Sequence, residues 1–278
     1  MKRFIKFKKT FYRVLFKNVF FVFLSFFVFS CTPQSDRNYT EAYAEIEKGH
    51  FRIATDLLEK AAQQEKDDKK RTKAYVEAAR IARFEIQDFE RAIRLNRQII
   101  LKSTDSRQRL LAQDAIAEIY FENIQNYSLA LKEMLVLEQL NQGAEQNEKL
   151  RFKIAHAQFL SGNIPSALEY IDASLKSPVS DRKNLLKLKA QVLIAQKKFD
   201  EALVCYEEIF KIDADFFQRE NLYISTSIVY EEKEDYGSAL SYLQKHQEQI
   251  KDKAYLELRV KRLKERLTNK PLFKGRRK

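Results

Sequence analysis

Apolar residues recur along the body of this chain at spacings of three and four, which is the pattern of one buried helix face. Leu168, Ile171 and Leu175 are one such series. The composition agrees, because Ala, Leu, Glu, Lys, Gln and Arg favour helices and the 278 residues include only 5 Gly and 4 Pro. The sequence therefore predicts an all-α protein, long enough to bury a large core.

A short turn phrase, polar–aromatic (or Ile)–x–x–Ala, is repeated six times between these helical segments. Its period of 35 to 38 residues is typical of an array of helix–turn–helix repeats. The small Ala allows the two helices of a repeat to approach closely, and the large residue before it fills the wedge between them. The six alanines are Ala54, Ala92, Ala130, Ala167, Ala202 and Ala239.

Two further positions share the register of this phrase. A larger packing residue follows each Ala by four positions, except in the second repeat, where Asn96 stands there. A small residue precedes the aromatic by nine or ten positions, and we place it in the first helix of each repeat. These small residues are Ala42, Ala79, Ala117, Ala155, Ala190 and Ser227.

The expected helices come in six pairs, joined by polar loops at 65–72, 102–108, 141–147 and 176–182. The pairs are 39–48 with 51–64, 73–86 with 89–101, 110–124 with 127–140, 148–160 with 164–175, 184–195 with 199–210, and 220–232 with 236–249.

These features resemble the tetratricopeptide repeat family over about residues 39–250. The small-x-x-Tyr pairing of that family is present in Ala117-x-x-Tyr120 and in Ser227-x-x-Tyr230, whereas Trp and the closing Pro of each repeat are missing. The resemblance implies a right-handed α-solenoid of about six repeats. The amphipathic segment 251–267 would cap its last exposed core. Residues 268–278 form a basic tail, which we expect to be disordered.

The first thirty residues predict export. Seven basic and no acidic residues lie there, and an apolar run from Val19 to Phe29 follows the basic stretch. This run is shorter than the ~20 residues that cross a bilayer, as in a secretory signal. The ending Val28-Phe29-Ser30-Cys31 resembles the lipobox of bacterial lipoproteins, which implies acylation of Cys31. An uncleaved anchor is the alternative. Residues 31–38 would then be a polar tether, and Thr32 after the Cys favours the outer membrane in the lipoproteins it resembles.

The formal charge of +12 is concentrated at the two ends of the chain. Residues 251–278 carry about +9, whereas residues 31–250 carry about −4. A nucleic-acid-binding protein more often carries its positive charge on the folded body, so nucleic acid is disfavoured as a partner. The tail can hold an acidic partner, an anionic lipid or a cell-wall polymer, or can act as a solubilising segment alone. Its basic residues are Lys270, Lys274, Arg276, Arg277 and Lys278.

The sequence carries no recognisable catalytic or metal-binding motif. Its three histidines lie in different repeats, and no phosphate-binding glycine-rich loop or nucleophile elbow is present. Cys205 falls on the packing side of a helix, where a buried structural thiol is expected. We therefore expect no cofactor and no metal, and an enzyme only as a weak third hypothesis.

The concave face of such a stack, lined by the first helix of each repeat, is the expected binding surface. Mixed basic and aromatic side chains suit an acidic or extended protein segment. Transfer of the tetratricopeptide pattern places there Tyr43, Lys73, Arg80, Arg83, Lys149, Phe152, His156, Lys187 and Gln191. The alternative is that each is an ordinary solvated residue.

The leading hypothesis is a membrane-anchored periplasmic scaffold for protein–protein interaction in the assembly of an outer-membrane complex. The combination of lipobox and repeats resembles the β-barrel-assembly lipoprotein and the type IV pilus pilotin. A second hypothesis is an adaptor that tethers a cell-wall enzyme.

Overall fold

The computed structural model describes residues 33–140, 143–176 and 181–268. These residues form fourteen α-helices, two π-helical turns and no strand. By its contacts the chain divides into two compact units, residues 1–109 and 110–278, and each is described by itself. Cys31 and the basic tail from Lys270 to Lys278 lie outside the described residues.

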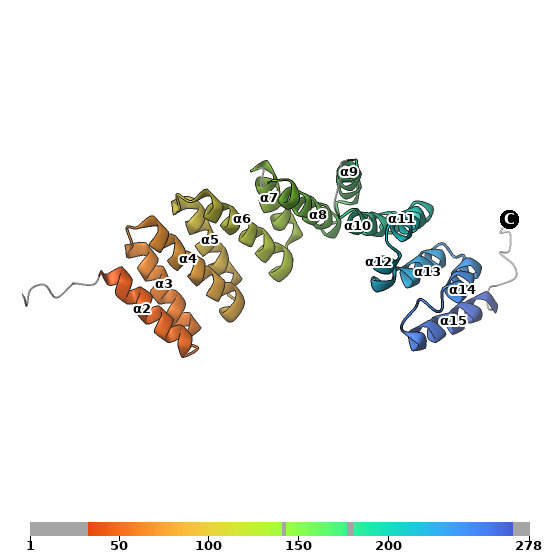
Figure 1. Cartoon of the computed structure of the whole chain (residues 1–278), viewed down its shortest axis with the longest axis horizontal. Coiled ribbons are helices and arrows are strands. Elements are labelled where there is room, and N and C mark those ends of the chain that lie inside the picture. The colour runs from red at the N-terminus through yellow and green to blue at the C-terminus, as the bar shows by residue number, and fades with distance from the viewer. Residues whose placement is uncertain (1–32, 141–142, 177–180, 269–278) are drawn as a thin grey trace, which may run out of the picture. The chain divides into compact units, whose positions relative to one another are not determined.

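The described part of the first unit contains two complete helical hairpins (Figure 1). The first hairpin is α2 (Gln34–Glu47) with α3 (Phe51–Gln64). The second is α4 (Asp68–Ile81), extended by the π-turn η1 (Ala82–Ile86), with α5 (Phe89–Lys102). Each helix packs on the next along the chain.

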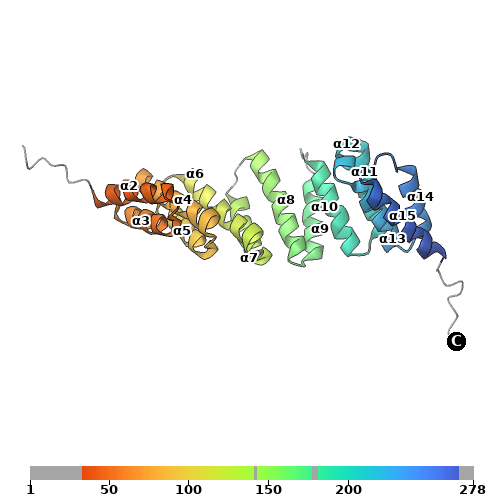
Figure 2. The same ribbon diagram turned by 90° about the horizontal axis from the view of Figure 1, so that it is seen from below.

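The second unit continues the alternation and ends with one additional helix (Figure 2). Its helices pack on their neighbours in sequence from α7 onward, and α11 also contacts α13 directly. The elements are α6 (Ser106–Glu118), which begins within the first unit, η2 (Ile119–Asn123), α7 (Tyr127–Gln139), α8 (Ala144–Leu160), α9 (Ile164–Leu175), α10 (Arg182–Ala195), α11 (Phe199–Ile212), α12 (Ala214–Arg219), α13 (Leu222–Glu232), α14 (Tyr236–Lys245) and α15 (Lys253–Thr268).

The alanine of each turn phrase lies at the contact between the two helices of its hairpin. All six alanines are 0% exposed, and the packing residues four positions later are buried as well. Asn96, the polar exception, is also buried, and its side-chain amide donates to the carbonyl of Ala92 at 2.9 Å. The hydrogen bond satisfies this amide inside the core, so the hairpin tolerates it.

The residue two positions before each of the six second helices has a left-handed backbone. Its φ angle lies between 57° and 82° in all six hairpins, although only Gly49 and Gly162 are glycines. The next N–H donates to a carbonyl five residues back in four hairpins and six residues back in the two with π-turns. This closure satisfies the carbonyls at the end of the first helix. The non-glycine residues in this conformation are Gln87, Gln125, Lys197 and Glu234.

The polar residue that precedes each second helix accepts a capping hydrogen bond in three hairpins. The side chains of Asp88, Asn126 and Asp235 each accept from the backbone N–H three residues later. His50, Asn163 and Lys198 make no such bond, so in their hairpins the side chain does not cap the helix.

Several first helices begin earlier than the apolar pattern predicts. Residues 34–38, expected as tether, form the first turn of α2, where Ser35 donates to Glu65 and Asn38 donates to Gln64. Similarly, α4 begins at Asp68, five residues before the expected start at Lys73, and the side chain of Asp67 caps it. These turns are fixed by polar contacts between helix ends, which leave no apolar periodicity in the sequence.

Two differences concern the C-terminal part of the second unit. The short helix α12 was not expected, and it buries Phe216 and Phe217. The predicted capping segment is present as α15, which packs on α14 through the buried Leu256 and Leu263. Leu267, expected on the same face, is 37% exposed.

Candidate functional site

In the first unit, the predicted residues Tyr43 and Lys73 lie on neighbouring first helices, α2 and α4. The ring of Tyr43 packs 4.9 Å from that of Tyr39, and the two hydroxyls are 3.1 Å apart. The Lys73 ammonium lies 5.7 Å from the centre of the Tyr39 ring. Burial and the Tyr39 hydrogen bond raise the pKa of Tyr43 to about 12, so this phenol stays protonated at neutral pH.

The two predicted arginines of this unit are engaged by their own hairpin. Arg80 pairs with Glu77 at 2.9 Å and with Glu85 at 3.2 Å. Arg83 lies in η1 with its guanidinium 4.9 Å from the centre of the Phe84 ring. Neither arginine therefore presents an unpaired positive charge to a partner.

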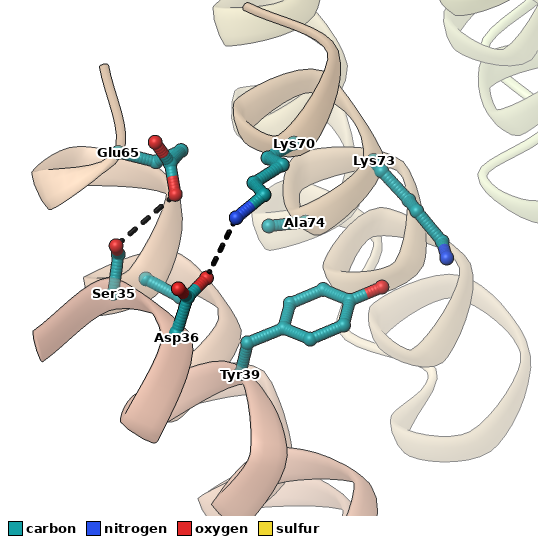
Figure 3. A pocket seen from close by; sticks show the side chains of 8 residues that line it. Ser35, Asp36, Tyr39, Glu65, Lys70, Lys73 and Ala74 are labelled. Atoms are coloured by element: carbon teal, nitrogen blue, oxygen red, sulfur yellow. Dashed lines mark hydrogen bonds and ion pairs between the residues drawn. The ribbon is translucent and has the colours of Figure 1, made fainter. Parts of the chain in front are cut away.

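A small cavity of about 210 Å³ lies where the start of α2 meets the end of α3 and the start of α4 (Figure 3). Figure 3 shows Lys70 directed at Asp36 and Ser35 directed at Glu65, whereas Lys73 extends past the ring of Tyr39. The polar groups at its mouth thus bind one another, and its volume admits only a small group.

A larger groove lies in the second unit between η2, α8 and the start of α10, and we call it the α8 groove. Its cavity is about 480 Å³, and the predicted residues Lys149, Phe152 and His156 all line it. The His156 ring lies 5.5 Å from Phe121 and 5.9 Å from Phe152, centre to centre. The full lining is Phe121, Glu148, Lys149, Phe152, Lys153, His156, Asp181 and Leu185.

The charges around the α8 groove are paired within the protein. Lys153 binds Glu118 at 2.9 Å, and Glu148 accepts from the backbone N–H of Asp181 at 2.8 Å. Burial acts to lower the pKa of Lys153, but the bond to Glu118 outweighs it and the pKa lies above its usual value. Because these charges are already paired, the part of the groove left to contact a partner is its aromatic wall.

His156 is neutral at pH 7 in this setting. Burial, and after it the positive charge of Lys187, holds its pKa below the usual value. Lys187 lies on α10 and pairs with Glu220 at 2.7 Å. Gln191 is exposed four residues further along α10. Neither Lys187 nor Gln191 lines the groove. Of the five residues predicted on α8 and α10, the structure therefore brings Lys149, Phe152 and His156 together and leaves the two residues of α10 apart.

Sequence reasoning missed Phe121 and Leu185, which complete the wall. Phe121 follows Tyr120 of the small-x-x-Tyr pair, and this adjacency was the available signal. Leu185 is 2% exposed at the start of α10, where the pattern showed only a core residue.

A second cavity of this unit, about 550 Å³, lies between α11, α13 and α14 and was not expected. Its rings pack on one another, with Phe217 and Tyr223 4.9 Å apart and Tyr242 and His246 4.6 Å apart. Phe217 belongs to α12, so a prediction without that helix could not assemble this site.

The described residues contain no candidate metal centre and one buried thiol. No group of three or more His, Cys, Asp and Glu residues that could hold a metal ion occurs in the described part of the chain. Cys205 is a buried free thiol, as predicted, and burial raises its pKa to about 11. A thiol with this pKa is a poor nucleophile at neutral pH. Among the helices that the structure describes, none has the length and apolar character to span a bilayer.

The described residues thus form an all-α array of helical hairpins with an apolar groove on α8 and no candidate metal centre. The array matches solved tetratricopeptide repeat proteins. One from Parabacteroides merdae ATCC 43184 is 14% identical, with a TM-score of 0.55, over 84% of this chain and 87% of that one. The MamA protein is 18% identical, with a TM-score of 0.52, over 66% and 94%.

A further match is YrrB, described as a tetratricopeptide repeat protein with an unusual peptide-binding site. It is 16% identical, with a TM-score of 0.51, over 74% of this chain and 97% of that one. No protein-family model matches the sequence, and no curated protein is significantly similar to it. The fold is therefore that of tetratricopeptide repeat proteins, as the repeated turn phrase predicted.

Proposed function

We propose that this protein is a membrane-anchored scaffold that binds an extended segment of a partner protein in the α8 groove. The observation that carries the proposal is the aromatic wall of Phe121, Phe152 and His156, half-buried and open to a cavity of about 480 Å³. Aromatic pockets that lose water on binding supply most of the affinity at protein interfaces. The fold supports a protein partner, because YrrB has a peptide-binding site on the same architecture.

The ion pair of Lys153 supports a partner that is more apolar than the sequence alone suggests. Mixed basic and aromatic side chains, Lys149 among them, were predicted to suit an acidic or extended segment, whereas Lys153, the other lysine of the groove, is bound to Glu118. Affinity should therefore come mainly from an apolar or aromatic side chain of the partner. Rim charges would mainly steer its approach.

Anchoring is proposed from the sequence alone. The lipobox-like ending at Cys31 supports a lipid anchor in the outer membrane, facing the periplasm, with assembly of an envelope complex as the task. Two or three acyl chains would hold the protein stably, since one chain gives only marginal binding.

The test is photo-crosslinking from within the groove. A benzoylphenylalanine at Phe152 of the full chain, irradiated in native envelopes, should form a discrete adduct. The crosslinked partner is identified by mass spectrometry. A barrel-assembly or secretin component would support the assembly role, whereas a cell-wall enzyme would support the adaptor hypothesis. The matched control places the same group at Glu169, an exposed residue of α9 in the same unit.

Removal of one wall residue should weaken the adduct. Phe121→Ala in the Phe152 crosslinking variant is expected to lower adduct yield about tenfold, the effect of losing one interface anchor. If the adducts from positions 152 and 169 are the same, or if Phe121→Ala changes nothing, the groove is not the binding site.

A further inference from the structure

The start of α2 fixes how much chain separates the fold from the proposed lipid anchor. Only Thr32 and Pro33 stand between Cys31 and Gln34, the first residue of α2. Three fully extended residues span at most about 11 Å. A helix that begins at Gln34 cannot lie far from a membrane that holds Cys31.

The beginning of α2 lies beside two other chain segments of the first unit. Ser35 donates to Glu65 at 3.0 Å, and Asp36 pairs with Lys70 at 3.1 Å, as Figure 3 shows. Asp68 in turn accepts from the hydroxyl of Thr104 at 2.6 Å. Residues 34–37, 65–71 and 102–107 therefore form one end of this unit, which we call the loop end.

Charge on the loop end suits an anionic surface. Seven basic residues lie there against five acidic ones. The acidic side chains are bound within the protein: Asp67 caps α4, Asp105 accepts from backbone N–H groups, and the other three make the contacts just described. Lys66 and Lys69 are exposed and form no ion pair with any described residue.

We propose that the loop end of the first unit docks on the anionic headgroups of the membrane that holds Cys31. This inference rests on the anchor in the proposed function and adds an orientation to it. The lipid holds the end within reach, and Lys66 and Lys69 contact the headgroup phosphates, each strengthening the contact about fivefold. The turn between α2 and α3, about 20 Å away along the helices, then faces away from the membrane.

The experiment uses the full lipidated chain in vesicles of phosphatidylglycerol and phosphatidylcholine with a headgroup-bound nitroxide quencher. A fluorophore is attached at Gln63→Cys or, as the matched control, at Arg52→Cys. Both positions are exposed and lie on α3, near its loop end and its far end respectively. The label at position 63 should be quenched at least about threefold more than that at position 52, because about 16 Å of helix separates them.

Charge reversal tests the lysines. Lys66→Glu with Lys69→Glu should lower quenching at position 63 on anionic vesicles and leave it unchanged on pure phosphatidylcholine. Lys48→Glu with Arg52→Glu, at the far end of the same hairpin, should have no such effect.

Mass spectrometry of the N-terminal peptide shows whether Cys31 is acylated, and this separates failure of the anchor from failure of the docking. A Cys31 without acyl mass would overturn the anchor and this orientation with it. An acylated Cys31 with equal quenching at positions 63 and 52 would overturn the docking alone. Equal effects of the two charge reversals would overturn the role of Lys66 and Lys69.

Discussion

The imidazole of His156 stands between two phenyl rings in the α8 groove, and its protonation would place a charge against this apolar wall. Burial and the Lys187 charge oppose that protonation and hold the pKa below its usual value. The wall is therefore apolar at neutral pH and becomes charged only in acid.

Removing the Lys187 charge should raise the pKa of His156 part of the way toward about 6.5, since burial remains. We expect Lys187→Gln to shift the titration midpoint of His156 upward in an NMR experiment. The His246 midpoint, lowered by its own burial and Lys245, is the internal control. An unchanged His156 midpoint would show that Lys187 does not act on it.

The same shift links stability to pH. As pH falls through about 6.5, the unfolded chain binds a proton at this residue before the folded chain does. The contribution of neutral His156 to stability is therefore complete above about pH 6.5 and is lost as pH falls toward the lower folded pKa.

At the scale of the element, the left-handed residue before each second helix is a shared requirement that the sequence meets with glycine only twice. A side chain in this conformation is strained, whereas glycine is not. Lys197→Gly should therefore stabilise the second unit by about 0.5–1 kcal/mol in urea unfolding, after the entropic cost of glycine.

The matched control is Gly162→Ala in the same unit. No atom lies within 4 Å of a Cβ built there, so any loss of stability comes from its φ of 82° and not from a clash. Stabilisation by both changes, or by neither, would contradict a conformational origin.

The two π-turns account for an irregularity of the sequence. The small residue of the first helix precedes the aromatic by ten positions in the second and third repeats and by nine in the others. Those two repeats contain η1 and η2, where the closing N–H reaches back six residues and not five. A π-turn holds one additional residue within a helix, so the spacing of ten is its signature.

Deletion of Phe84, which is 59% exposed in η1, should convert this π-turn to α-helix and keep the turn phrase in register. We expect a cooperative thermal transition and a loss on the order of 1 kcal/mol. Deletion of Lys60, an exposed residue inside α3, is the control and should disrupt the unit, because it rotates the rest of the helix face. Similar losses of stability from both deletions would show that η1 does not contain one additional residue that the helix can lose.

Sequence periodicity predicted the helix boundaries that depend on apolar packing. All six second helices start at the aromatic or Ile of the turn phrase, because the buried Ala after it recurs at a fixed place. It could not predict the early starts of α2 and α4, which depend on polar contacts such as Ser35 with Glu65. Of the α8 groove it found Phe152 and His156 but not Leu185, whose exposure to a cavity depends on how α10 meets α8.

At the scale of the whole molecule, the last helix determines whether the second unit keeps its core from water. Leu263 on α15 is 1% exposed and belongs to the core cluster that includes α11, α13 and α14. Arg259 of α15 also pairs with Glu231, and Arg266 donates to the Tyr236 hydroxyl at 3.3 Å.

Leu263→Ala should therefore cost about 2–5 kcal/mol of unfolding free energy in urea or calorimetry. The control is Leu258→Ala on the same helix, which is 43% exposed and should cost less than about 0.5 kcal/mol. Equal and small effects would mean that α15 does not cap the core.

The neighbour-to-neighbour packing of the hairpins has a mechanical consequence. Within each unit, the described helices bind mainly those adjacent in sequence, and the described residues form no strand that could pair with a distant one. Under tension between the proposed anchor at Cys31 and a partner in the α8 groove, such a chain would yield one hairpin at a time. Each yielding hairpin releases length while the remaining hairpins keep their contacts. The protein would then behave as an extensible tether that accommodates movement between the membrane and the partner protein bound in the α8 groove.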